Sequence, residues 1–157
     1  MPRVAIALGS NLGNREAALA FAISRLSSIL TNTRVSEIVE TWPVGENAEG
    51  QNLYLNAVAV GETDLSGRAV LDALLAIEAD FGRERSYLNA PRTLDLDLIL
   101  LGDAIIVEPG LEVPHPRFRE RFFVLGPLAE VASDMTDPVS GQTVAQLLRA
   151  LLRDQNR

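Results

Sequence analysis

Two stretches of the chain carry apolar residues at helical spacing, and each is flanked by short runs typical of strands. Apolar residues recur at steps of three and four within 19–30 and again within 70–81. Asn14 stands where the first helix would begin, and either Ser66 or Asp64 would begin the second; all three residue types cap helices well. A chain that alternates such helices with short strands buries their apolar faces by packing the helices on a sheet. We therefore expect an α+β fold.

The strand-like runs are short and bounded by turn residues. Several of them follow one another too closely for helical crossovers, which favours a largely antiparallel sheet with helices packed on its faces. No repeat or interdomain linker interrupts the chain, so we expect one domain over 1–157. The expected strands are Val4–Leu8, Arg34–Thr41, Tyr54–Val60, Leu94–Leu101 and Ala104–Val107, the last two as a hairpin, and further helices are expected over Phe122–Val131 and around Val144–Leu152.

Composition excludes several kinds of chemistry. The chain has no Cys, one His, and 14 basic residues that are all Arg. Disulfides, cysteine nucleophiles, multi-histidine metal sites, Lys-based phosphate loops and Schiff bases are therefore ruled out. The net charge of −7 argues against a nucleic-acid partner. No apolar run approaches the ~18 residues of a spanning helix, and no signal-peptide pattern opens the chain. We expect a cytoplasmic protein without membrane contact.

Two aspartates interrupt the most hydrophobic strand, Leu94–Leu101. Because strand side chains alternate, Asp95 and Asp97 are expected on one face, followed there by Ile99 and Leu101, while the intervening leucines face the core. Two like charges beside an apolar strand are unfavourable unless they are compensated. Mg²⁺ takes such oxygen ligands and commonly adds substrate phosphates to one or two carboxylates. The alternative is a strand end that lies in solvent.

Arginines precede and follow the aspartate strand. Guanidinium groups suit phosphate oxygens, so the set indicates a polyphosphate ligand, although any one arginine could instead be solvated or paired with Glu84 or Glu120. His115 lies between two prolines beside the second arginine group, where it is either a phosphate hydrogen-bond donor or structural. The upstream arginines are Arg83, Arg85 and Arg92, and the downstream ones are Arg117, Arg119 and Arg121.

Three further features have both a functional and a structural interpretation. Tyr54 and Asn56 share a strand face and would suit a planar heterocycle with amide-like edges, or simply pack at the core rim. Glu78 stands at the edge of an apolar helix face, where an ordinary solvated Glu is the simpler interpretation. Residues 9–13, Gly-Ser-Asn-Leu-Gly, match no phosphate-binding fingerprint and are expected only to shape the turn from strand to helix.

Assembled, these residues resemble the 6-hydroxymethyl-7,8-dihydropterin pyrophosphokinase family of folate biosynthesis. The stretch Ala90–Ile99, Ala-Pro-Arg-Thr-Leu-Asp-Leu-Asp-Leu-Ile, looks like the signature of that family. The resemblance implies a ferredoxin-like fold and an enzyme that transfers pyrophosphate from ATP to the pterin hydroxymethyl group, releasing AMP. Further motifs in family order are 9–13 (Gly-Ser-Asn-Leu-Gly), 41–45 (Thr-Trp-Pro-Val-Gly), 54–57 (Tyr-Leu-Asn-Ala), Glu78 with 82–85 (Gly-Arg-Glu-Arg), Pro114-His115 and 121–125 (Arg-Phe-Phe-Val-Leu).

The resemblance also implies a role for each matching residue. The catalytic residues would be Arg83, Arg92, Asp95 and Asp97, of which the two aspartates would bind two Mg²⁺ ions. The ATP-binding residues would be Glu78, Arg83, Arg85, Arg92, Leu98, His115 and Arg121. The pterin ring would lie between Tyr54 and Phe123, with Asn56 at its edge and main-chain groups near Thr41, Pro43 and Val44 completing the pocket.

Four positions depart from the family pattern, and they bear on nucleotide contacts and loop closure: Leu75, Leu88, Asn89 and Pro116. Two other functions are weighed. A Mg-dependent nucleotidyltransferase or phosphohydrolase could use the same aspartates, but it leaves Tyr54, Asn56 and Phe123 unexplained. A ferredoxin-like binding module without catalysis would not need two aspartates beside six arginines. We expect a monomer whose partners are ATP and the pterin.

Overall fold

The computed structural model describes residues 1–42, 52–82 and 93–155. Strand β1 (Arg3–Ser10) runs antiparallel between β4 (Tyr54–Glu62) and β5 (Asp95–Leu101). Strands β2 (Thr31–Val35) and β3 (Val39–Thr41) pair with the far side of β4, so the main sheet has the order β2-β4-β1-β5 with β3 also on β4. The antiparallel sheet predicted from the sequence is confirmed.

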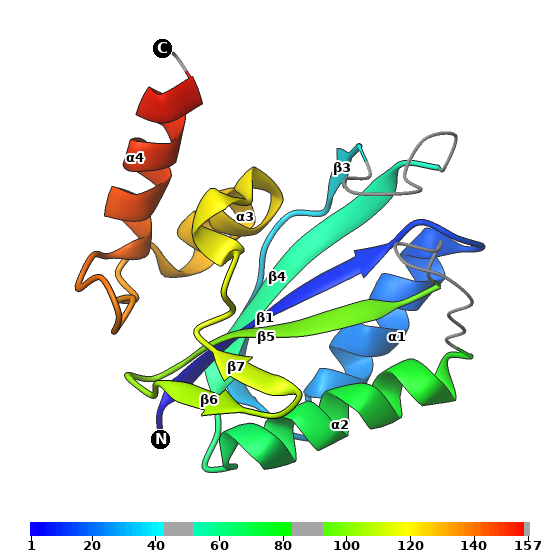
Figure 1. Cartoon of the computed structure of the whole chain (residues 1–157). Coiled ribbons are helices and arrows are strands. Elements are labelled where there is room, and N and C mark those ends of the chain that lie inside the picture. The colour runs from blue at the N-terminus through cyan, green and yellow to red at the C-terminus, as the bar shows by residue number, and fades with distance from the viewer. Residues whose placement is uncertain (43–51, 83–92, 156–157) are drawn as a thin grey trace.

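Helices cover both faces of this sheet (Figure 1). Helices α1 (Arg15–Leu26) and α2 (Gly67–Asp80) pack on one face. The short helix η1 (Phe118–Glu120) and helices α3 (Phe122–Ala132) and α4 (Val144–Gln155) lie on the other side, where α3 contacts the sheet and α4 packs on α3. The order β1-α1-β2-β4-α2-β5, with this strand order, is the ferredoxin-like α+β fold predicted from the sequence.

Local signals mark the helix ends as predicted. The Asn14 side chain accepts a hydrogen bond from the Ala17 N–H (3.0 Å), and the Ser66 hydroxyl accepts one from the Ala69 N–H (3.1 Å). Each bond satisfies a backbone donor that the first helical turn cannot pair. None of the helices in the three described ranges is long and apolar enough to cross a membrane.

Alternate side chains of strand β1 contribute to two different hydrophobic cores, one on each face of the sheet. Val4, Ile6 and Leu8 point to the α1–α2 face, whereas Ala5 and Ala7 point to the α3 face. The bulky side chains therefore fill the core beneath α1 and α2. Ala5 is fully buried and Ala7 only partly buried on the other face, and the candidate site lies on that face toward Gly9.

A β-bulge changes the expected pattern in β5. Ile6 pairs with Leu98 and Ala5 pairs with Leu100, so Ile99 is an extra residue without a partner of its own in β1. The extra residue reverses the alternation beyond it. Leu101 was predicted on the aspartate face, and that prediction is wrong, because Leu101 packs in the α1–α2 core.

The single strand predicted over Arg34–Thr41 is also wrong, since β2 and β3 are separate. Between them, the Ser36 N–H donates to the Val58 carbonyl (2.9 Å), while the Ser36 hydroxyl accepts from the Val58 N–H (2.9 Å). A side-chain oxygen thus replaces a backbone carbonyl in the ladder. This substitution interrupts the regular pairing with β4.

The segment Ala104–Val107 does not form a hairpin with β5. Instead β6 (Ile106–Glu108) pairs with β7 (Leu111–Val113) in a two-stranded sheet of its own. The connection of Pro109 and Gly110, with Gly110 at φ 76°, is a two-residue turn suited to that short hairpin.

Candidate active site

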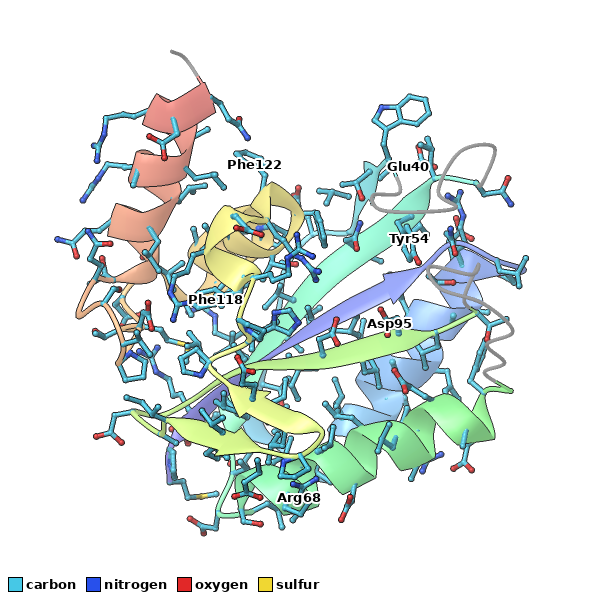
Figure 2. The ribbon with its side chains drawn as sticks, viewed as in Figure 1. Glu40, Tyr54, Arg68, Asp95, Phe118 and Phe122 are labelled. Carbon is cyan, nitrogen blue, oxygen red and sulfur yellow. The ribbon has the colours of Figure 1, made fainter. Side chains whose placement is uncertain are left out.

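Four of the residues predicted to bind a pterin or a metal lie on one face of the sheet: Tyr54, Asn56, Asp95 and Asp97. In the strand register, Gly9 of β1 pairs with Asn56 of β4 on one side and with Asp95 of β5 on the other. Ala7 likewise stands opposite Asp97. Figure 2 shows Tyr54 and Asp95 toward the same end of the sheet. Three strands that are distant in sequence therefore bring an amide, an aromatic ring and two carboxylates together.

Gly9 occupies the centre of this arrangement. A Cβ built on Gly9 would lie 3.2 Å from Asn56 Oδ1 and 3.4 Å from Tyr54 Cδ1, so both side chains lie over its backbone. The sequence interpretation placed Gly9 in a turn after the strand. That interpretation is wrong, because β1 continues to Ser10 with Gly9 paired on both sides. Gly9 is the residue of the site that the sequence analysis missed, and only the strand register identifies it.

The Asn56 side chain has a defined orientation. It is buried, and its Nδ2 donates a hydrogen bond to the Thr41 hydroxyl on β3. The amide oxygen of Asn56 therefore lies on the Gly9 side, facing the region between β4 and β5. An amide fixed in this way presents a hydrogen-bonding edge without further loss of side-chain freedom.

Asp95 and Asp97 suit a magnesium ion by their chemistry. Both side chains are partly exposed, and they lie two residues apart on the same face of β5. Within the described ranges, no group of three or more acidic or histidine side chains gathers around them. Water or phosphate oxygens would therefore complete the coordination, as Mg²⁺ commonly requires. The residues present fit this ion.

His115 lies beside the aspartate strand, held by its backbone. Its N–H donates to the Ile99 carbonyl at the bulge (2.9 Å), and its Nδ1 accepts from the Arg117 N–H (3.2 Å). Burial lowers the pKa of His115 to about 4, with Arg121 and Arg117 acting in the same direction against Asp95. The ring is therefore neutral at pH 7, and its proton is on Nε2 because Nδ1 accepts a bond.

Arg121 and Phe123 lie together at the start of α3. The Arg121 guanidinium carbon is 5.6 Å from the centroid of the Phe123 ring, which is partly buried against the core. Two neighbouring arginines have structural partners instead. Arg117 pairs with Glu120, as the alternative interpretation allowed, and Arg119 binds the buried Asp137. Arg121 is thus the downstream arginine that remains a candidate for phosphate.

Comparison with known proteins matches residues 5–133 to the family model of 7,8-dihydro-6-hydroxymethylpterin-pyrophosphokinase. The chain belongs to this family. It is 42% identical over 132 residues to the 2-amino-4-hydroxy-6-hydroxymethyldihydropteridine pyrophosphokinase of Bacillus subtilis, covering 83% of this chain and 78% of that protein. It is 40% identical to the enzyme of the same name from Pseudomonas aeruginosa, covering 94% and 91%.

Solved structures agree in fold. A Plasmodium falciparum HPPK-DHPS structure superposes with a TM-score of 0.78 at 14% identity, over 99% of this chain. A wild-type structure of the same protein gives 0.73 at 13% identity, over 98%. The chain spans less than half of those chains, 45% and 46% respectively. At this identity the likeness concerns the ferredoxin-like fold alone.

Two residues predicted to bind ATP are buried, Leu98 in β5 and Glu78 in α2. Leu98 is buried in the α1–α2 core, so any contact with ATP would come from its main chain. Glu78 is only 2% exposed, and its Oε2 accepts the Leu96 N–H at 2.7 Å. The simpler interpretation of Glu78, a solvated side chain, is wrong. The remaining predicted residues lie outside the described residues: Pro43, Val44, Arg83, Arg85 and Arg92.

Proposed function

We propose that the chain acts as a 2-amino-4-hydroxy-6-hydroxymethyldihydropteridine pyrophosphokinase of folate biosynthesis. It transfers pyrophosphate from ATP to the hydroxymethyl group of 6-hydroxymethyl-7,8-dihydropterin and releases AMP. Family membership supports this reaction. The structural observation that supports it is the pairing of Gly9 with Asn56 on one side and with Asp95 on the other. This pairing brings a residue proposed to bind the pterin near a residue proposed to bind the metal.

The pterin side of the site comes from β3, β4 and α3. We assign the edge of the ring to the Asn56 amide, which the Thr41 hydroxyl orients. Tyr54 and Phe123 supply aromatic faces on which the pterin ring can stack. Such stacking is favourable even between uncharged rings. Gly9 has no side chain, so the heterocycle can approach the β1 backbone. Main-chain groups of Pro43 and Val44 stay part of this prediction.

The phosphate side comes from β5 and the segment that follows β7. Asp95 and Asp97 would hold Mg²⁺, which when bound neutralises phosphate charge and lowers the barrier to transfer. His115 would donate a hydrogen bond through Nε2–H, and Arg121 would supply positive charge to the same polyphosphate. Arg83, Arg85 and Arg92 stay predictions for this side, as do the two-ion stoichiometry, the monomeric state and the cytoplasmic location.

For this reaction the protein mainly has to align the two substrates, and no covalent intermediate with the protein is needed. The pterin hydroxyl oxygen bonds to the β-phosphorus of ATP while the bond from that phosphorus to the α,β-bridging oxygen breaks. AMP leaves with that oxygen, and the hydroxyl proton is released to solvent. Asn56 fixes one reactant over β4, and the aspartates fix the other over β5. With Gly9 between them, the two reacting groups meet over the central strand, which replaces a bimolecular encounter by a fixed geometry.

Product analysis tests this function. Purified protein is incubated with ATP, Mg²⁺ and 6-hydroxymethyl-7,8-dihydropterin, and nucleotides and pterins are separated by chromatography. We expect AMP and a pterin diphosphate in equal amounts, both dependent on the pterin. Release of pyrophosphate or inorganic phosphate would instead support a nucleotidyltransferase or phosphohydrolase, and absence of turnover would support a binding module.

A further inference from the structure

We propose that Glu78 is a positioning residue for the aspartate pair, acting through the backbone of β5 from helix α2. The inference rests on the proposed function, because it concerns the Mg²⁺–ATP side of the same site. It assigns to Glu78 no contact with ATP. The carboxylate instead holds the peptide group that joins Asp95 to Leu96 at a fixed place.

The geometry is specific. Glu78 lies near the end of α2, and its side chain is 2% exposed. Its Oε2 accepts the backbone N–H of Leu96 at 2.7 Å, a short bond of the charge-assisted type. Leu96 is the single residue between the two aspartates, so each of them is one peptide away from the anchored N–H. A shift of that peptide moves both carboxylates together.

The position of β5 in the sheet explains why such an anchor is needed. Among the described strands, β5 has β1 on one side and no strand on the other. Alternate backbone groups on an outer edge lack a strand partner and leave the strand free to flex. Two bonds from outside the sheet replace that partner, Glu78 at Leu96 and the His115 N–H at the Ile99 carbonyl. Asp95 and Asp97 lie at the N-terminal end of β5, where Glu78 bonds to Leu96.

The choice of residue supports a dedicated role. The preceding residue on α2, Ile77, is buried in the core, as is Leu74, and an apolar side chain at position 78 would avoid burying a carboxylate. A carboxylate at this depth costs free energy unless it is hydrogen-bonded, and the Leu96 N–H supplies such a bond. A buried carboxylate is thus retained where it anchors the strand that carries the proposed metal ligands.

Two conservative variants of Glu78 separate the effect of side-chain length from the effect of the carboxylate charge. Glu78→Gln keeps an oxygen at the same distance but removes the charge, whereas Glu78→Asp keeps the charge and withdraws it by one methylene. Calorimetry measures the Kd for Mg²⁺ with a non-hydrolysable ATP analogue, and for the pterin separately. Amide hydrogen exchange measures protection of the Leu96 N–H. Asp80→Asn is the matched control, because Asp80 lies on the same helix and pairs with Arg25 at the surface.

We expect Glu78→Asp to weaken Mg²⁺–nucleotide binding about tenfold or more, as other outer-shell changes do, and to expose the Leu96 N–H to faster exchange. Glu78→Gln should lie closer to wild type in both measurements, and the pterin Kd should stay within about twofold in both variants, since Asn56 is on another strand. If Glu78→Asp binds Mg²⁺–nucleotide as well as Glu78→Gln or better, the proposal is wrong. Failure of the wild type to form AMP would reject the proposed function but leave this binding comparison valid.

Discussion

The Asn56 side chain donates a hydrogen bond from Nδ2 to the Thr41 hydroxyl, across the pairing of β4 with β3. The bond settles which end of the amide faces the site, because Asn56 Oδ1 then lies beside Gly9. Asn56 is buried, so an amide without this partner would leave polar atoms unsatisfied. We therefore expect Thr41 to affect pterin binding through the orientation of Asn56.

Thr41→Val should weaken pterin binding, because valine has the same shape without the acceptor. Loss of one such hydrogen bond costs about 1 kcal/mol, which corresponds to roughly a fivefold rise in Kd. Calorimetric titration with the pterin measures this change in Kd. Thr41→Ser is the control and should bind as the wild type does. Equal affinity of the Val and wild-type proteins would remove Thr41 from this role.

Asp97→Ala should lower turnover strongly and leave pterin binding nearly intact, because Asp97 lies on β5 while the residues proposed to bind the pterin lie on β3, β4 and α3. Steady-state AMP formation and the pterin Kd are the two measurements. The control is Asp103→Ala, which removes an exposed carboxylate just beyond the same strand and should change neither. Retained turnover in Asp97→Ala would exclude Asp97 from the metal site.

Phe123→Ala should weaken pterin binding by about 1–3 kcal/mol, the usual cost of losing an aromatic stacking partner. Calorimetric titration gives the Kd directly. Phe122→Ala is the matched control, because its ring is 47% exposed on the neighbouring position of α3. A Phe123→Ala protein that binds the pterin normally would disprove the stacking role.

His115 should titrate far below an ordinary histidine. Burial first, and then Arg121, lower its pKa to about 4 from 6.5. Because protonation favours the unfolded state, the contribution of His115 to stability is complete above about pH 6.5 and is lost as the pH falls toward 4. His115 is the only histidine, so its ring proton signals can be followed by NMR without assignment.

The same titration has a thermodynamic counterpart. Between pH 6.5 and 4, the wild type should lose more unfolding free energy than His115→Gln, whose amide does not titrate there. Denaturant unfolding at several pH values measures the difference. An NMR pKa at or above 6.5, or parallel pH dependence in the two proteins, would contradict the neutral, buried state.

Asp137 should contribute to stability rather than to catalysis. It is fully buried and accepts bonds from Arg119 Nε at 2.5 Å, from the Ser140 hydroxyl at 2.7 Å and from the Val139 N–H at 3.0 Å. Burial alone would raise the pKa of Asp137, but these bonds outweigh it and lower the pKa to about 2. Its stabilisation is present above about pH 3.8 and is lost as the pH falls toward 2.

Asp137→Asn should therefore reduce the unfolding free energy by about 3 kcal/mol, because it leaves a partly buried arginine without its counter-charge. Denaturant unfolding at pH 7 measures this loss. Asp134→Asn breaks the exposed pair with Arg3 and should cost less than about 1 kcal/mol. Similar losses in the two variants would show that burial of the Asp137 pair adds nothing.

Local rules already determined much of this protein from its sequence. The caps at Asn14 and Ser66 are governed by residues three apart, and the shared face of Asp95 and Asp97 follows from the two-residue period of a strand. The family motifs predicted the candidate site residues one by one. Each of these signals lies within a few residues of the feature it predicts.

Tertiary structure decided everything that depends on pairing between distant strands. The register that sets Asn56 and Asp95 on either side of Gly9, the bulge at Ile99, and the bond from Glu78 to Leu96 each join residues far apart in the chain. No local period encodes which strand is the neighbour or where its register falls. Long-range burial and hydrogen-bond satisfaction select these partners, so only the fold shows which of the described candidate residues lie near one another.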